Sequence, residues 1–362
     1  MTVRRLAASA YAPLGRVHPR VSRVGFGGYR VDDRIDAHRE ALREALVAGV
    51  SLIDTSTNYA DGHSEILVGE VVRDVVARGA ARREDLVLVT KAGYVQGSNQ
   101  REAERRARAG VPWSEMTEYA PDCWHCIAPD FLADQLTASL ERLAMPKVDV
   151  LLLHNPEYFL TDAAHRGVPP GEAREAFYDR LARAFRHLES ERAAGRIGTY
   201  GVSSNTFVVP HDKDDAVSLE RVLACAGPGF AAVQFPFNPL ETGARELLHT
   251  ADGRSVLDVA RSAGLGVLVN RPLNAFSGRN LVRFAAFAPD ILRELGRDAA
   301  WDEERARPLA SYLDTAFAPA RDGGSSLAQR TLRALLGTPG VDAVLVGMRR
   351  PAYVRDVLGA FA

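Results

Sequence analysis

Short, continuous hydrophobic runs alternate with amphipathic segments along almost the whole chain. Uninterrupted runs rich in Val and Leu are typical of parallel strands that are buried on both faces. The predicted strands are 24–28, 50–54, 86–91, 148–154, 199–204, 231–235, 265–271 and 342–347. Apolar residues at helical spacing between them predict helices, most clearly at 38–49, 64–77, 130–144 and 255–264. Eight such strand and helix units predict a (β/α)8 TIM barrel.

The ends of the predicted elements fit this fold. Ser64 is placed to cap its helix, and Gly49 and Gly264 stand where helices end. The alternative is a doubly wound open sheet. The glycine cluster at 25–28 lacks the third glycine of a dinucleotide-binding turn, so it is weak support for that alternative.

The connections between the elements indicate one domain with long loops at one end of the barrel. No linker divides the chain, so residues 1–362 are predicted to form a single domain. The longest connections, 92–129, 155–175 and 274–325, each follow a predicted strand. In a barrel such βα loops lie at the catalytic face, and long ones are expected to shape a pocket there.

Composition excludes several classes of function. The 362 residues are 46% hydrophobic and 25% charged, with a formal net charge of −1. This balance favours neither nucleic acid nor an acidic membrane surface as a partner. No apolar run is long enough for a membrane span, and three cysteines fit a reducing cytoplasm. A small-molecule substrate is expected, and the oligomeric state is open.

Polar side chains stand at the ends of three consecutive predicted strands. Asp54 ends the second strand, and Tyr59 lies in the loop after it. Lys91 ends the third strand and His154 ends the fourth. Turn chemistry could explain Asp54 alone. Because these strands are neighbours in a barrel, the four side chains are expected to converge on one side of the mouth.

These four residue types suit proton transfer to a carbonyl. A tyrosine with a pKa of about 10 is a poor proton donor, and the Lys91 ammonium would make the Tyr59 hydroxyl more acidic. Asp54 would pair with Lys91 and offset its burial. His154 would donate a hydrogen bond to a substrate carbonyl or share in moving its proton. The set predicts reduction of a carbonyl by hydride from a cofactor, or the reverse oxidation, without a metal site.

The motifs that carry these residues resemble those of the aldo-keto reductases over nearly the whole chain. They are GFGGYR, IDTSTNYADGHSEILVGE, TKAG, VDVLLLHNPE, GRIGTYGVSSNTF, VQFPFNPLE and VLVGMRRPAYVRDVL. The resemblance implies a barrel that binds NAD(P) extended across its mouth. It also implies that Tyr59 is the general acid/base, that Lys91 and Asp54 tune it, and that His154 orients the substrate.

The resemblance further implies a set of cofactor contacts. Ser203, Gln234 and either Asn205 or Ser204 resemble the groups that hold the nicotinamide carboxamide, although strand ends are often polar without such a role. Gly278 and Arg279 resemble the loop that folds over the pyrophosphate. The predicted cofactor-binding residues are Gly28, Ser203, Asn205, Gln234, Arg271, Gly278, Arg279, Gly347, Arg349 and Arg350.

Two departures from the family pattern affect the cofactor. Asn270 or Arg271 stands where many members stack an aromatic residue on the nicotinamide. Arg271 would instead contact the pyrophosphate or a substrate anion, or pair with an acidic neighbour. Val357 stands where an asparagine commonly faces the adenine. Arg349 and Arg350 would bind a 2′-phosphate, which favours NADP over NAD, or form a solvated surface pair.

Three functions are compatible with this pattern. The leading one is NAD(P)-dependent reduction of an aldehyde, ketone or sugar-like carbonyl. One alternative is a dehydrogenase that acts mainly oxidatively on a sugar or pyridoxal-type alcohol. The other is a cofactor-binding regulatory subunit, like the potassium-channel β subunits that share this fold. The substrate and the physiological direction are open.

The long loop 92–129 contains two further features. Cys123 and Cys126 form a single C-x-x-C pair without a second pair at zinc spacing, and a structural or pocket-lining role is expected. Trp113, Tyr119 and Trp124 are expected either to form an apolar wall over the substrate or to anchor the loop to the barrel.

Overall fold

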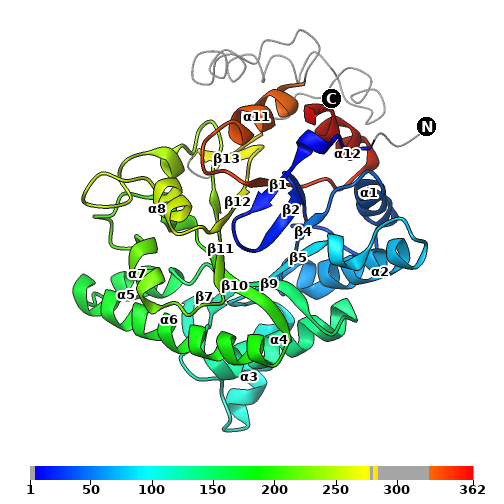
Figure 1. The fold of residues 1–362 in the computed structure, drawn as a ribbon. Coiled ribbons are helices and arrows are strands. Elements are labelled where there is room, and N and C mark those ends of the chain that lie inside the picture. The colour runs from blue at the N-terminus through cyan, green and yellow to red at the C-terminus, as the bar shows by residue number, and fades with distance from the viewer. Residues whose placement is uncertain (1–4, 278–279, 284–325, 362) are drawn as a thin grey trace.

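Eight parallel strands close into a barrel in a computed structural model that describes residues 5–277, 280–283 and 326–361 (Figure 1). Their order around the barrel is β10-β11-β12-β15-β3-β4-β5-β9. They are β3 Val24–Gly27, β4 Leu52–Asp54, β5 Val87–Ala92, β9 Val148–His154, β10 Ile197–Ser203, β11 Phe230–Pro236, β12 Gly266–Asn270 and β15 Ala343–Val346. Each corresponds to one predicted strand, and the (β/α)8 barrel is confirmed.

Helices surround the barrel and cover the outer faces of its strands (Figure 1). The helices between and after the barrel strands include α1 Asp36–Val47, α2 His63–Ala77, α4 Pro129–Leu143, α6 Pro170–Ala193, α7 Leu219–Cys225, α8 Val256–Ser262, α11 Leu327–Leu336 and α12 Pro351–Leu358. Short 3-10 helices are η1 Ala8–Ala10, η2 Tyr59–Gly62, η3 Arg83–Asp85, η4 Asn205–Val208, η5 Gly243–Arg245 and η6 Gly359–Phe361. Among the described residues, no helix is both long and apolar enough to cross a membrane.

The helix ends confirm two predictions and correct one. Gly49 and Gly264 follow α1 and α8 with φ of 103° and 63°, which glycine adopts without strain. The prediction that Ser64 caps α2 is wrong, because α2 begins at His63 after Gly62, whose φ is 92°. Ser64 instead donates to the Gly28 carbonyl at 3.0 Å, and a Cβ on Gly28 would lie 2.7 Å from Ser64 Oγ. Gly28 is therefore required for this packing.

An N-terminal hairpin of β1 Tyr11–Leu14 and β2 His18–Ser22 closes one end of the barrel. Leu14 and Val21 belong to the same buried cluster as the side chains of the barrel interior. Arg16 donates to the Phe230 carbonyl at the start of β11. The hairpin thus seals the barrel at the amino ends of its strands, and the carboxyl ends form the accessible mouth. No sequence prediction covered this hairpin.

The long connections at the mouth contain regular structure. The connection after β5 contains α3 Ser98–Arg108 and a small antiparallel sheet of β6 Tyr94–Val95, β7 Thr117–Ala120 and β8 Cys123–His125. The connection after β9 contains α5 Tyr158–His165, and the connection after β12 begins with the hairpin β13 Asn274–Ser277 and β14 Asn280–Arg283. These elements extend the protein beyond the carboxyl ends of β5, β9 and β12, next to the predicted site.

Candidate active site

Three adjacent barrel strands bring the predicted side chains together. β4 pairs with β5 and β5 pairs with β9, so Asp54, Lys91 and His154 lie at neighbouring strand ends. Tyr59 follows at the start of η2. Lys91 Nζ lies 2.7 Å from Asp54 Oδ2 and 3.2 Å from Tyr59 Oη. The sequence placed these side chains correctly because strand ends in a barrel meet at one face.

Lys91 is buried and fully hydrogen-bonded. Its side chain is 0% exposed, and its third donor contacts the Thr55 carbonyl at 2.9 Å. Burial alone would lower the pKa of Lys91, but the Asp54 carboxylate and Tyr59 outweigh burial and raise it. Lys91 is therefore a fixed ammonium beside the Tyr59 hydroxyl.

The Tyr59 hydroxyl is less acidic than the sequence predicted. Burial raises the pKa of Tyr59 and Asp54 adds to the rise, whereas Lys91 acts in the opposite direction. Lys91 therefore has the expected local effect, but the net direction is upward. Tyr59 therefore keeps its proton at neutral pH, as a proton donor must.

His154 is held from two sides. Its Nδ1 lies 3.0 Å from Ser56 Oγ, and its backbone carbonyl accepts a hydrogen bond from His125 Nε2 at 2.7 Å. The ring of Tyr94 lies edge-on to its imidazole, with centroids 4.6 Å apart. Sequence reasoning missed Ser56, although it lies in the same motif as Asp54 and Tyr59.

A line of polar side chains crosses the barrel from Asp54. Gln234 Nε2 donates to Asp54 Oδ1 at 2.8 Å, and Gln234 Oε1 accepts from Ser203 Oγ at 3.1 Å. Asn270 Nδ2 lies 3.5 Å from the same Gln234 oxygen. Gln234 is therefore part of the network that fixes Asp54, in addition to any contact with a cofactor.

Ser204 and Asn205, between which the sequence did not decide, differ in the structure. Ser204 is fully buried, and its Oγ caps η4 by accepting from Thr206 N at 3.1 Å. The Asn205 side chain is half-buried, while its backbone N donates to Glu157 Oε1 at 2.8 Å. The Ser204 hydroxyl is thus engaged, whereas the Asn205 side-chain amide forms no hydrogen bond within the described residues.

Glu157, which sequence reasoning also missed, is a buried carboxyl three residues after His154. Burial raises the pKa of Glu157 to about 7, against the lowering effect of backbone N–H groups that include that of Asn205. Its Oε2 has no hydrogen-bond partner among the described residues. Asp54 is the last residue of its strand, whereas Glu157 lies three residues beyond the end of β9, so its position in the sequence was a weaker signal.

A groove of about 730 Å³ extends from Tyr59 towards the end of the chain. Tyr29, Arg30 and Asn58 line it near Tyr59, and Arg349, Arg350 and Tyr353 line it where α12 begins. Within the described part of the chain, Arg30, Arg349 and Arg350 form no ion pair. The groove therefore joins the predicted proton donor to three guanidinium groups that have no acidic partner among the described residues, and Arg30 is an addition to the predicted set.

The remaining predicted cofactor residues have mixed surroundings. Arg271 has a φ of 53° and forms an ion pair with Glu241 at 3.0 Å, which is the acidic-neighbour alternative. Gly347 is exposed, with open space around its Cα. Gly278 and Arg279 lie outside the described residues.

The aromatic residues of the long loop do not act alike. Trp113 packs edge-on against Phe131 and donates Nε1–H to Asp134 at 2.8 Å, so it anchors the loop to α4. Tyr119 instead packs against Tyr158 with ring centroids 4.6 Å apart. Tyr158 in turn contacts Tyr94, which places Tyr119 in a row of rings that leads to His154.

The two cysteines of the same loop are free thiols. Burial raises the pKa of Cys126 to about 12, and its Sγ lies 3.3 Å from the Ser114 carbonyl. Cys123 is half-buried beside Tyr158. Neither thiol belongs to a group of potential metal ligands within the described residues.

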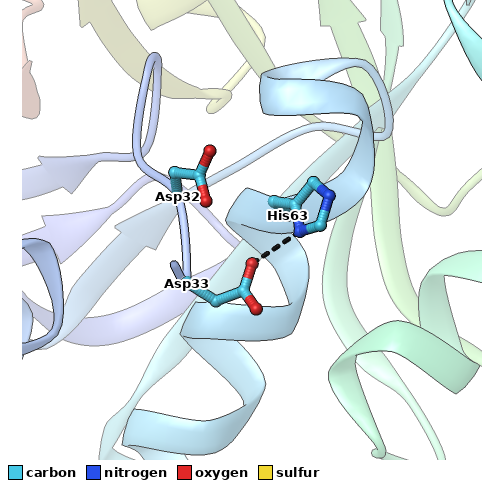
Figure 2. Close-up of side chains that lie close together, drawn as sticks. All are labelled: Asp32, Asp33 and His63. Atoms are coloured by element: carbon cyan, nitrogen blue, oxygen red, sulfur yellow. Dashed lines mark hydrogen bonds and ion pairs between the residues drawn. The ribbon is translucent and has the colours of Figure 1, made fainter. Parts of the chain in front are cut away.

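One such group consists of Asp32, which lines the groove, together with Asp33 and His63 (Figure 2). Asp33 Oδ1 is 2.6 Å from His63 Nδ1, and Asp32 forms a two-point ion pair with Arg34. Each carboxylate thus already has a partner, and we interpret the group as an arrangement that fixes the loop after β3 against α2.

Comparison with known proteins decides the family. The model of the aldo/keto reductase family matches residues 23–362. The chain belongs to the aldo/keto reductase family. As an aldo/keto reductase it is, at the level of the family, an NAD(P)-dependent oxidoreductase.

Individual relatives of this aldo/keto reductase are distant. The NADH-specific methylglyoxal reductase of Escherichia coli (strain K12) is 24% identical over 200 residues, which cover 53% of this chain and 51% of that protein. The uncharacterized oxidoreductase YqkF of Bacillus subtilis (strain 168) is 23% identical over 343 residues, which cover 94% and 87%. The structure of the glycerol dehydrogenase AKR11B4 from Gluconobacter oxydans superposes with a TM-score of 0.62 at 21% identity, covering 98% of this chain and 91% of that one. This last likeness supports the fold alone.

Proposed function

We propose that this aldo/keto reductase uses NADPH to reduce an aldehyde, ketone or sugar-like carbonyl. The observation that carries the proposal is the position of Tyr59. Its hydroxyl lies 3.2 Å from Lys91 Nζ, and its side chain also lines the groove that contains Arg349 and Arg350. A single residue thus joins the proton-donating network to a site that is suited to a nucleotide.

The chemistry follows from the network. A bound NADPH supplies the hydride. Tyr59 donates its phenolic proton to the carbonyl oxygen, and Lys91 stabilises the phenolate that results. Asp54 holds Lys91 in place, and His154 orients the substrate. The upward direction of the Tyr59 pKa keeps the hydroxyl protonated at neutral pH, as proton donation to a carbonyl requires.

The groove supports NADPH over NADH. Two neighbouring arginines, Arg349 and Arg350, precede α12 and offer donors that suit a 2′-phosphate. Asn205, rather than Ser204, is assigned to the nicotinamide carboxamide, because the Ser204 hydroxyl already caps η4. Ser203 and Gln234 would complete that subsite.

Replacing Tyr59 with Phe tests the proposal. The variant keeps the ring that lines the groove and loses only the proton, so turnover of aldehydes with NADPH is expected to fall by about 10²-fold or more. Quenching of protein fluorescence by NADPH should persist at a similar midpoint. Turnover close to that of the unaltered enzyme would show that Tyr59 is not the proton donor. Failure of the unaltered enzyme to bind either nucleotide would remove the cofactor assignment.

A further inference from the structure

Ser56 has one proton and two neighbours that can only accept it. Its Oγ lies 2.7 Å from Asn58 Oδ1 and 3.3 Å from the Lys91 carbonyl oxygen. His154 Nδ1 is its third polar neighbour, at 3.0 Å. If Ser56 donates to either oxygen, its lone pair is left for His154, and Nδ1 must then carry a hydrogen.

A second amide fixes the orientation of Asn58. Asn58 Nδ2 donates to Gln96 Oε1 at 3.1 Å, and Gln96 Nε2 donates to the Asp122 carbonyl at 3.4 Å. A backbone carbonyl cannot donate, so it sets the direction of every hydrogen bond in this series. Asn58 therefore presents its oxygen, and not its nitrogen, to Ser56.

His154 has only one proton to place. Burial lowers its pKa well below the usual value, and the positive charge of Lys91 and the nearby His125 act in the same direction. The neutral ring thus carries a hydrogen on one nitrogen. With that hydrogen on Nδ1, Nε2 has a lone pair. Within the described residues, no hydrogen bond reaches Nε2.

We propose that Ser56 and Asn58 are positioning residues that hold His154 as its Nδ1–H tautomer, so that Nε2 accepts a hydrogen bond from a hydroxyl group beside the substrate carbonyl. The tautomer rests on the hydrogen-bond geometry around Nδ1 and on the neutral state of the buried ring, whereas the substrate class, a hydroxy-substituted aldehyde or ketone, rests on the proposed function. The assignment reverses the expectation that His154 donates to the carbonyl. Tyr59 is then the hydrogen-bond donor to the reacting carbonyl oxygen. His154 Nε2 accepts a hydrogen bond from a hydroxyl on the neighbouring carbon.

Nitrogen NMR of the histidine rings tests the tautomer without any turnover. The enzyme is labelled with ¹⁵N-histidine, and the His154 signals are assigned by their loss in His154→Asn. Two-bond and three-bond couplings to the ring protons distinguish a protonated Nδ1 from a protonated Nε2. We expect a protonated Nδ1 in the unaltered protein, and a protonated Nε2 there would overturn the proposal.

Two variants test whether Ser56 determines the tautomer of His154. Ser56→Ala removes the acceptor, so the proton should move to Nε2. Asn58→Asp is the matched control, because a carboxylate still accepts from Ser56 and the Nδ1–H form should persist. An unchanged His154 spectrum in Ser56→Ala would show that Ser56 does not set the tautomer.

Kinetics test the substrate class with two aldehydes that differ by one hydroxyl. Lactaldehyde carries a hydroxyl beside its carbonyl, and propionaldehyde does not. With NADPH, kcat/KM is expected to favour lactaldehyde by tenfold or more, and Ser56→Ala should lose most of that preference. Equal values for the two aldehydes in the unaltered enzyme would contradict the substrate class. Turnover of neither aldehyde, with Nδ1 protonated, would count against the proposed function and not against the tautomer.

Discussion

The two charged regions of the mouth differ in how their charges are balanced. Around Lys91, each charge has a partner within the protein, since Asp54 contacts both Lys91 and Gln234. In the groove, Arg349 and Arg350 form no ion pair with the described residues. Internal partners hold the first region in one geometry before any ligand arrives. The second region keeps its donors for an anion, so the difference separates the chemistry from the binding of the nucleotide.

Removing Lys91 would break the balanced region and have the largest effect. Lys91→Met leaves Asp54 buried without its cation, which is expected to lower the free energy of unfolding by about 3–5 kcal/mol. Turnover should disappear, because nothing would stabilise the Tyr59 phenolate. Urea denaturation without cofactor, together with an NADPH-dependent reduction assay, measures both effects.

Two further variants separate this explanation from a general loss of packing. Lys147→Met changes an exposed lysine before β9 and should alter stability by less than about 0.5 kcal/mol. Asp54→Asn combined with Lys91→Met removes both charges and should recover part of the lost stability. A double variant as unstable as Lys91→Met would show that the uncompensated carboxylate is not the cause.

Glu157 is the exception within the balanced region, because it is buried without a cation. Its pKa is about 7 in the folded protein, against 4.5 as its usual value. Below pH 4.5 both the folded and the unfolded chain hold the proton. Between pH 4.5 and 7 the unfolded chain loses it first, so folding becomes less favourable as pH rises, by about 3 kcal/mol in total.

Glu157→Gln should remove this pH dependence. The difference in unfolding free energy between the variant and the unaltered protein is expected to shift by about 3 kcal/mol in favour of the variant from pH 4.5 to pH 8. Denaturation curves across that range measure it. The control is Glu65→Gln, since Glu65 is also buried but is paired with Arg142 and Thr90, and it should destabilise at pH 8. A parallel pH profile for Glu157→Gln and the unaltered protein would contradict the assignment.

The sequence predicted what depends on order along the chain. Continuous apolar runs end at Asp54, Lys91 and His154, and a barrel forces such ends together, so their convergence could be predicted. The hairpin that includes Leu14 could not, because its strands are short and its partners lie in distant parts of the chain. The role of Ser64 in α2 was mispredicted for a similar reason, since its partner Gly28 follows β3 and is distant in the sequence.

Electrostatic properties of the site depend on burial, and sequence does not report burial. The expected acidity of Tyr59 considered Lys91 alone, whereas desolvation acts in the opposite direction and dominates. Glu157 was overlooked because a carboxylate is unusual only once it is known to be buried. The tautomer of His154 requires hydrogen bonds from Ser56 through Gln96, which span two loops.

Replacing Arg350 tests the role of the groove, and its effect is expected to be the smallest of those described. Arg350→Ala removes charge-assisted hydrogen bonds to a 2′-phosphate, each worth about 1.5–3 kcal/mol, so the Kd for NADPH should rise by about 10-fold to 100-fold. The Kd for NADH should change by less than about threefold, and stability should be unchanged because the Arg350 side chain has no ion pair among the described residues. Fluorescence titrations with both nucleotides, at low and high salt, measure the effect, and Arg186→Ala on the exposed face of α6 is the matched control. Equal weakening of NADPH and NADH would place Arg350 against the shared pyrophosphate, and no weakening of either would make it part of a solvated surface pair.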